Sequence, residues 1–284
     1  GTSSGAGPLI ELHNNLKELF ADKIGEQITS VDIVDVENLI GRCVVAGNVR
    51  RSAALAIGQY DDFRYLEMKN DQEKLYHHRW GSNNTFNAEV GMDYSWHANQ
   101  SQTNGEPGYI WLENAKAYGR MKDGENYDDI EVMGFNPCVE QSLHNAEMCC
   151  LVETFPAKHD DYEDYLRTLK CAYLYGKTVT LVNTHWPETN AKMLKNRRIG
   201  LSQSGIVQAF NKHGRREMLE WCDNAYTHIN ELDTEYSNWL CVPNSIKMTS
   251  IKPSGTVSLL NGSTPGIHFP EDEYYIIRIR FSKS

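Results

Sequence analysis

Apolar residues recur at helical spacing in three long stretches of the chain. The first stretch runs from Pro8 to about Ile24, where Leu9, Leu12, Leu16, Leu19 and Phe20 lie three or four positions apart. The second begins at Tyr162 and ends at Gly176, and the third extends from Met218 to Ile229. Shorter or more highly charged helices are expected at three further places: 35–40, 61–78 and 114–121.

Strand candidates lie between these helices. The run from Val44 to Val49 is nearly all apolar, as in strands buried on both faces, and Lys177 to Val182 is rich in β-branched residues. The pattern over 160–183 therefore predicts a helix followed by a strand. Tyr274 to Phe281 alternates and predicts another strand. Because helices and strands alternate through much of the chain, we predict an α/β fold.

Composition describes a globular chain without membrane helices. Of 284 residues, 40% are hydrophobic and 23% are charged. The net charge of −10 argues against direct nucleic-acid binding, which requires a basic surface. No apolar run approaches the ~20 residues of a membrane span, and no secretory signal opens the chain. Seven cysteines, an odd number, indicate thiols in a reducing, cytoplasmic setting.

Both ends of the sequence look cut. The chain begins without Met in a Gly/Ser-rich segment, and it stops soon after the predicted strand Tyr274–Phe281. We therefore expect an internal fragment of a longer enzyme, with residues 1–284 forming a single catalytic domain truncated at both ends.

The segment Gly134–Glu140 carries the strongest candidate chemistry. Pro137 disfavours helix at Asn136, so the segment is expected to be extended or turning. In an extended chain Asn136, Cys138 and Glu140 share one face, but the first and last lie roughly 13 Å apart. A shared site therefore requires a curled loop tip. The alternative is a strand end with a buried structural cysteine.

Several motifs, in order, resemble one enzyme family. Asn136-Pro137-Cys138-Val139-Glu140 resembles the active-site finger loop of ribonucleotide reductases, and Glu147–Glu153 resembles their second cysteine motif. The more exact resemblance is to the adenosylcobalamin-dependent (class II) ribonucleoside-triphosphate reductases. Further similar segments are 47–53, 81–85, 104–112, 196–201, 252–258 and 263–270. The resemblance implies a ten-stranded α/β barrel with the loop carrying Cys138 inside.

The resemblance also implies roles for individual residues. Cys138 would be the thiyl radical that takes the 3′ hydrogen from the ribose, and burial of this thiol is expected because a neutral thiol suits the role. Glu140 would be the general base at the 3′ hydroxyl, and Asn136 would hydrogen-bond the substrate. Cys149 would be one of two reducing cysteines, its partner lying upstream of this sequence. Adjacent Cys150 stands where Asn is common, and Val139 where Gly is frequent.

Three further segments have both a functional and a simpler interpretation. By resemblance, Pro253, Ser254, Gly255, Thr256 and Val257 grip substrate phosphate; an ordinary Ser/Thr helix cap is the alternative. Ser82, Asn83 and Asn84 would lie near the substrate pocket, whereas their composition alone predicts a plain loop. Segment 196–201 would be a family signature or simply a basic helix end.

The implied reaction is reduction of ribonucleotides, as triphosphates, to 2′-deoxyribonucleotides. Its cofactor would be adenosylcobalamin, with no protein metal site. Its partners would be the ribonucleotide substrate, deoxynucleotide effectors and a dithiol reductant such as thioredoxin. A class I diphosphate reductase chain and a non-catalytic nucleotide-binding fragment stay open as alternatives.

Other enzyme classes are less well supported by the residues. A non-radical thiol nucleophile needs a histidine base, and none lies within five residues of Cys138. A zinc site built on Cys138, Cys149 and Cys150 lacks a Cys-x-x-Cys pair. A glycyl-radical enzyme would need a C-terminal glycine loop, which has no match here.

Overall fold

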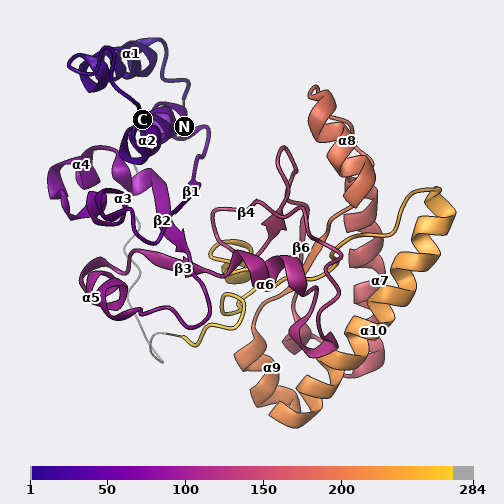
Figure 1. Cartoon of the computed structure of the whole chain (residues 1–284). Coiled ribbons are helices and arrows are strands. Elements are labelled where there is room, and N and C mark those ends of the chain that lie inside the picture. Colours follow the sequence, from indigo (N-terminus) through magenta and orange to yellow (C-terminus); the bar gives the residue numbers. More distant parts are fainter. Residues whose placement is uncertain (1, 271–284) are drawn as a thin grey trace. The chain divides into compact units, whose positions relative to one another are not determined.

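The computed structural model describes residues 2–270, so the predicted strand Tyr274–Phe281 lies outside the described residues. The chain has a mixed α/β fold and divides into two compact units, whose described parts are residues 2–114 and 115–270 (Figure 1). The single barrel domain expected over 1–284 stays a prediction. No helix among the described residues is long and apolar enough to cross a membrane.

The first unit is built on a three-stranded parallel sheet in the order β1-β2-β3. Ala54 pairs with Ser82, and Thr85 pairs with Gly108. Tyr65 packs against this sheet, and its hydroxyl oxygen lies 2.7 and 2.9 Å from the carbonyl oxygens of Ala56 and Thr85 and accepts from Thr85 N–H at 3.1 Å. The elements are α1 (Gly7–Phe20), α2 (Ser30–Val45), β1 (Ala54–Gly58), α3 (Phe63–Glu67), α4 (Gln72–His77), β2 (Ser82–Asn87), α5 (Ser95–Asn104) and β3 (Gly108–Ile110).

Two sequence predictions in this unit are wrong. The strand expected at Val44–Val49 is instead the end of α2 followed by a 3-10 turn at Ala46–Asn48. Thr29 and Asp32 form a capping box that starts α2, which continues to Val45, and Gly47 with a φ of +81° then turns the chain. The single helix expected over 61–78 is broken into α3 and α4, because Asp71 caps the second helix.

The second unit places long helices against short strands. Parallel strands β6 (Leu151–Thr154) and β7 (Gly200–Gln203) pair with each other, and β4 (Gly134–Phe135) pairs with β5 (Ser142–Leu143) as a hairpin. The main core lies between β6, β7 and two helices that run side by side in Figure 1, α7 (Tyr162–Val179) and α10 (Arg215–Leu240). The other helices are α6 (Leu112–Ala117), α8 (Pro187–Asn196), α9 (Ile206–His213) and α11 (Val257–Leu260).

Tyrosines form the buried stripe of α7, as their helical spacing predicts. Tyr165 and Tyr173 are both 0% exposed and belong to the main core.

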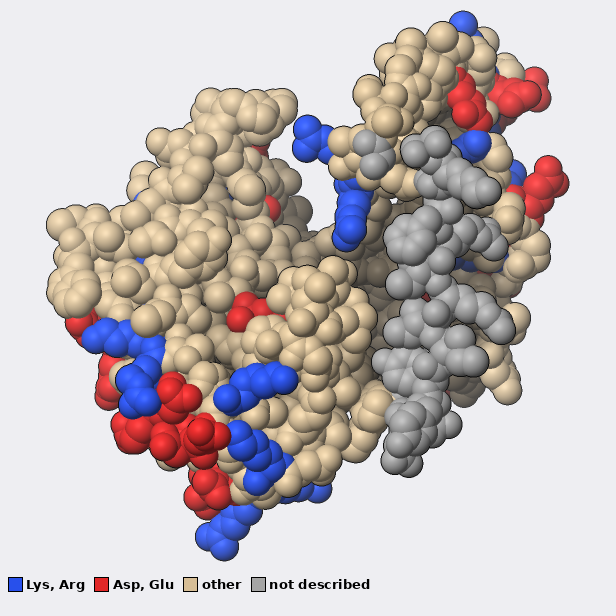
Figure 2. All heavy atoms as spheres, turned by 180° about the vertical axis from the view of Figure 1, so that it is seen from behind, with Lys and Arg blue, Asp and Glu red and all other residues tan. Residues whose placement is uncertain are grey.

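Acidic and basic side chains intermingle on the face shown in Figure 2. In the second unit, for example, Arg120 and Lys122 both pair with Asp223.

The strand predicted from Lys177 is wrong because a buried ion pair keeps this segment helical. Lys177 is 0% exposed, and its Nζ lies 2.7 Å from Asp233 Oδ1 on α10. Tyr173 also donates to Asp233 at 2.8 Å, and Ser245 N–H donates to the other carboxylate oxygen at 2.9 Å. Burial lowers the pKa of Lys177, which Asp233 opposes. These tertiary contacts outweigh the β-branched preference of residues 178–180.

Removing the cation from this pair tests its contribution to stability. Lys177→Met leaves the buried Asp233 carboxylate without its counter-charge, so we expect the free energy of unfolding in urea to fall by ~3–5 kcal/mol. Lys170→Met is the control, since Lys170 is exposed on the same helix; we expect a change within about 0.5 kcal/mol. Equal effects of the two substitutions would contradict the assignment.

Candidate active site

The segment 136–141 is a curled hairpin tip between β4 and β5. Asn136 N–H donates to the Gln141 carbonyl at 3.0 Å, and Gln141 N–H donates to Asn136 Oδ1 at 3.0 Å. Val139 N–H donates to the Asn136 carbonyl at 2.9 Å. Of the two predicted forms the segment is therefore the turning one, and the curled tip that a shared site requires is present.

Val139 occupies the tightest point of this turn. Its φ is +67°, in the left-handed region that glycine adopts without steric cost. Holding a β-branched residue there costs on the order of 1–3 kcal/mol. This geometry explains why a glycine would fit the same position.

The hairpin tip lines a cavity of about 280 Å³. Cys138 is exposed, so the expectation that its thiol is buried is wrong, because the turn carries the residue to the tip. Asn136 points back into the hairpin, where its amide oxygen is already engaged with Gln141. The lining residues are Cys138, Val139, Glu140, Ile251, Lys252, Pro253, Ile267 and His268.

Glu140 is the buried acid of this cavity. Its side chain is 2% exposed, and Oε1 accepts from Lys252 Nζ at 2.7 Å. Oε2 is buried and has no hydrogen-bond partner among the described residues. Because an unpaired buried carboxylate oxygen is unfavourable, this atom is poised to accept a hydrogen bond from a ligand hydroxyl.

Cys149 lies within electrostatic reach of the same groups. Burial raises the pKa of Cys149 to about 12, and the charge of Glu140 adds to the shift. Lys252 opposes it, and Cys138 also contributes. Burial likewise raises the pKa of Cys150. Cys149 is therefore a neutral thiol at pH 7, the form that carries the S–H hydrogen.

The candidate phosphate loop is partly occupied by its own contacts. Ser254 is 4% exposed, and its hydroxyl donates to Glu153 Oε2 at 2.9 Å and accepts from Ser258 N–H at 3.2 Å. The N-cap position of α11 is Thr256, whose side chain makes no capping hydrogen bond, so Ser254 meets the first turn of the helix only through Ser258 N–H. Gly255, Thr256 and Val257 are exposed, and nothing lies within 4 Å of a Cβ added at Gly255.

Glu153 fastens this loop to the strands. Its carboxylate accepts from Ser254 and from Ser204, which follows β7 and is 0% exposed. Ser204 also accepts from Gly266 N–H at 3.0 Å. One side chain of β6 therefore holds the segments around 254 and 266 beside the ends of β6 and β7.

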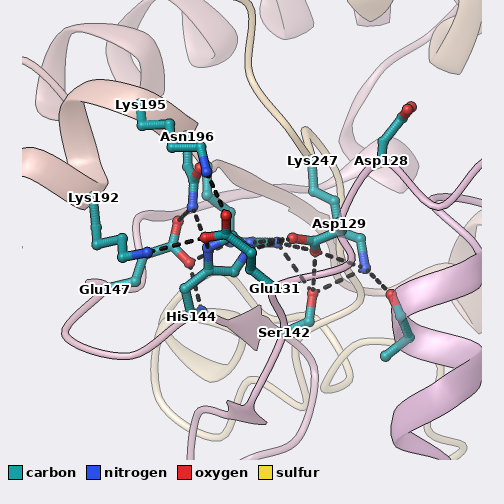
Figure 3. A network of polar contacts seen from close by, with 12 residues as sticks. Asp128, Asp129, Glu131, Ser142, His144, Glu147, Lys192, Lys195, Asn196 and Lys247 are labelled. Carbon is teal, nitrogen blue, oxygen red and sulfur yellow. Dashed lines mark hydrogen bonds and ion pairs between the residues drawn. The ribbon is translucent and has the colours of Figure 1, made fainter.

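A buried ion network supports the hairpin from behind (Figure 3). Arg198 is 0% exposed and donates to both oxygens of Asp129 at 2.6 and 2.8 Å. Its Nε donates to Glu147 at 3.0 Å, while His144 Nε2 lies 2.8 Å from Asp129. Burial alone raises the pKa of Asp129, but Arg198 and Lys247 outweigh it and hold the pKa below the usual value.

Sequence reasoning did not identify this network. The string 196–201 was noted only as a family signature or a basic helix end. Asn196 does end α8, and Arg197 has a positive φ of 46°, which turns the chain so that Arg198 enters the interior. An arginine directly before the apolar Ile199-Gly200-Leu201 is the sequence signal for a buried guanidinium. Its acidic partners are 51 and 69 residues away in sequence, so the ion pairs themselves are not visible locally.

Ser82, Asn83 and Asn84 belong to the first unit. They open β2 and form the middle strand of its sheet, so the loop that their composition predicts is wrong. Ser82 donates to Asn84 Oδ1 at 2.8 Å and accepts from Asn38 at 3.1 Å. Asn84 Nδ2 is buried without a hydrogen-bond partner among the described residues.

The described residues contain no group of three or more His, Cys, Asp or Glu side chains that could hold a metal ion. His268 does line the cavity with Cys138, although it is 130 residues away in sequence. A distance in sequence was therefore a poor criterion for excluding a histidine near this thiol.

Comparison with known proteins finds relatives that carry the same kind of name. The chain is 53% identical over its full length to a probable adenosylcobalamin-dependent ribonucleoside-triphosphate reductase of Dictyostelium discoideum, and 49% identical to the Euglena gracilis reductase of that name. It covers 38% and 39% of their lengths. A crystal structure of a B12-dependent (class II) ribonucleotide reductase matches 95% of this chain and 41% of its own, with a TM-score of 0.87 and 37% identity. No family model matches.

The close packing of the hairpin on β7 can be tested at Gly200. A Cβ added there would lie 2.4 Å from Leu151 Cδ2 and 2.5 Å from Gln141 Oε1. Gly200→Ala should therefore lower the free energy of unfolding by ~1–3 kcal/mol, and it should speed hydrogen exchange of the Gln141 amide.

Gly119→Ala is the control, because its Cβ would make only an ordinary contact at 3.6 Å. Urea unfolding and hydrogen–deuterium exchange measure both effects. Unchanged stability and exchange in Gly200→Ala would show that the hairpin does not depend on this approach.

Proposed function

We propose that this chain, whose whole length is similar to adenosylcobalamin-dependent ribonucleoside-triphosphate reductases, carries the radical-bearing loop and substrate site of such an enzyme. The chain spans about two fifths of the length of the curated relatives it matches. The observation that carries the proposal is the cavity shared by Cys138 and Glu140, with a free carboxylate oxygen on Glu140. The class I alternative is less well supported, because these relatives are named for adenosylcobalamin.

The proposed fold is the ten-stranded α/β barrel of this family, formed as one domain with the tip carrying Cys138 inside. Its support is the similarity to the class II structure over 95% of the chain. On this proposal Ser82, Asn83 and Asn84 lie near the substrate pocket.

Adenosylcobalamin would supply an organic radical when bound. The residue of this chain that fits radical transfer is Cys138. Its thiol is exposed at the hairpin tip, where another group can approach it. Cys138 is the residue that would meet the radical source. A dithiol reductant of the thioredoxin class would restore the enzyme in a reducing compartment such as the cytoplasm, and deoxynucleotides would act as effectors.

In the proposed reaction each of these residues carries out one step. The Cys138 sulfur radical takes the hydrogen atom from C3′, and Glu140 accepts the proton of the 3′ hydroxyl. The 2′ hydroxyl leaves as water, and Cys149 with a second thiol supplies two electrons and two protons as the pair becomes a disulfide. Cys138 returns its hydrogen atom to C3′, and Glu140 returns its proton to the 3′ oxygen. The sum is ribonucleotide plus dithiol giving deoxyribonucleotide, disulfide and water.

Asn136 has a narrower role than the resemblance implies. Its amide oxygen already accepts from Gln141 N–H, so its amide nitrogen is the group left to donate to substrate. The proposed phosphate contacts are likewise the exposed backbone N–H groups of Gly255, Thr256 and Val257, together with the Thr256 hydroxyl, because Ser254 donates to Glu153.

The radical assignment is tested by Cys138→Ser in the full-length protein. With adenosylcobalamin, a ribonucleoside triphosphate and a dithiol, we expect no deoxynucleotide, because the hydroxyl hydrogen of serine is held too strongly to be exchanged. Cys171→Ser is the control, since Cys171 is another exposed free thiol of the same unit. Deoxynucleotide formation by Cys138→Ser, measured by chromatography, would exclude the mechanism.

The phosphate loop is tested by Gly255→Val. The added side chain has open space around it, so the fold should survive while the loop is shielded from an approaching anion. We expect KM for the ribonucleoside triphosphate to rise at least ~10-fold, corresponding to the loss of about 1.4 kcal/mol of binding free energy.

Gly7→Val is the matched control, because a Cβ at Gly7 also meets nothing within 4 Å. Steady-state kinetics at saturating cofactor give both constants. An unchanged KM in Gly255→Val would place the phosphates elsewhere.

A further inference from the structure

Lys252 belongs to two parts of the site at once. Its backbone N–H donates to Ser202 Oγ at 2.8 Å, and its carbonyl accepts from Ser254 N–H at 2.9 Å. Its side chain crosses to the hairpin tip, where Nζ lies 2.7 Å from Glu140 Oε1. The residue that begins the candidate phosphate loop is thus the residue that holds the acid of the cavity.

Lys252 supplies the positive charge that contacts the Glu140 carboxylate. With 2% of its side chain exposed, the carboxylate has lost most of its hydration, so an ionised form needs a counter-charge. Lys252 is 29% exposed and supplies it. Burial lowers the pKa of Lys252, but the hydrogen bond and charge of Glu140 outweigh burial, so the pKa is raised overall and the ammonium stays charged.

The contact also orients the acid. Lys252 occupies Oε1 alone, and Oε2 is buried without a hydrogen-bond partner among the described residues. A carboxylate fixed by one oxygen presents the other in a defined direction. The backbone of Lys252 is itself fixed by Ser202 and Ser254, so the ammonium has a rigid base from which to hold Glu140.

The geometry points to Lys252 as a positioning residue that keeps Glu140 ionised, turns Oε2 toward the substrate hydroxyl, and ties this base to the loop that holds the phosphates of the same substrate. This inference rests on the proposed function. Lys252 itself does not touch the reacting atoms. Its side chain sets the base while its backbone sets the loop, so phosphate position and base position are fixed by one residue.

Other ionisable groups share this environment. The thiols of Cys138 and Cys149 interact with Lys252, and His268 lines the cavity. Neither thiol is a cation, so neither can replace the ammonium. The competing interpretation is that Lys252 merely fastens the hairpin to the loop, in which case its loss would lower stability without altering the ionisation of Glu140.

The test uses three variants of the full-length protein. Lys252→Met removes the charge, Lys252→Arg keeps a cation, and Lys195→Met is the control because Lys195 pairs with exposed Glu131 at the same 2.7 Å distance. Infrared difference spectra of ¹³C-glutamate-labelled protein, with Glu140→Gln as the reference, report the ionisation of Glu140 without requiring turnover. Steady-state kinetics across pH, with adenosylcobalamin bound, report kcat and KM.

We expect Lys252→Met to show a protonated Glu140 at pH 7 and a kcat lowered by the ~10²–10⁴-fold of a lost acid–base group. KM should change little, and activity should recover as the pH is raised, because base restores the carboxylate. Lys252→Arg should retain most of kcat, and Lys195→Met all of it.

The outcomes separate the two proposals. An ionised Glu140 in Lys252→Met, or a loss of stability with kcat unchanged, overturns the role of Lys252 while the reductase function stands. If Glu140 is protonated in Lys252→Met but the full-length protein reduces no ribonucleotide, the role of Lys252 in setting the acid is upheld and the reductase function is rejected.

Discussion

The buried guanidinium of Arg198 is the constraint on which the second unit depends. It is 0% exposed and pairs with two carboxylates, Asp129 and Glu147. Breaking a buried pair by removing one partner costs ~3–5 kcal/mol, because a charge is then left in the interior. The three charges must therefore be brought together for this unit to fold, and the segments that carry them are fixed as a consequence.

Those segments surround the candidate site. Asp129 precedes the hairpin, Glu147 precedes Cys149, and Arg198 leads into β7. Ser142 of β5 is also held, since it accepts from Arg198 at 3.2 Å and from Lys247 at 2.9 Å. The hairpin tip is short and strained at Val139, so it needs rigid support from behind, which the ion network provides (Figure 3).

In front of this support, the site combines the Glu140–Lys252 ion pair with the half-buried thiol of Cys149. The same burial that raises the pKa of Cys149 disfavours ionisation of a carboxyl. Lys252 offsets this effect of burial on Glu140, since its ammonium contacts the carboxylate directly. An ion pair and a thiol of raised pKa thus lie within electrostatic reach of each other beside the cavity.

Local patterns determined much about this protein without its structure. Helical spacing located α1, α7 and α10. In α7 and α10 the apolar stripe is buried in the main core, whereas none of the residues of α1 is fully buried. The order of helices and strands indicated the α/β class, and the motif around Cys138 indicated a resemblance to one family and the requirement for a curled tip. Each of these features depends on residues close together in sequence.

Tertiary structure decided the rest, through charges that are far apart in sequence. Lys177 stays helical because it pairs with Asp233, which lies 56 residues away in sequence. In β2, Ser82 is held by Asn38 and the backbone N–H of Asn84 by Glu106. Arg198 became the centre of an ion network, and Lys252 the partner of Glu140 across 112 residues. The local sequence does not show whether a polar residue is buried, because the free-energy cost of burying it depends on a partner that only the folded chain brings near.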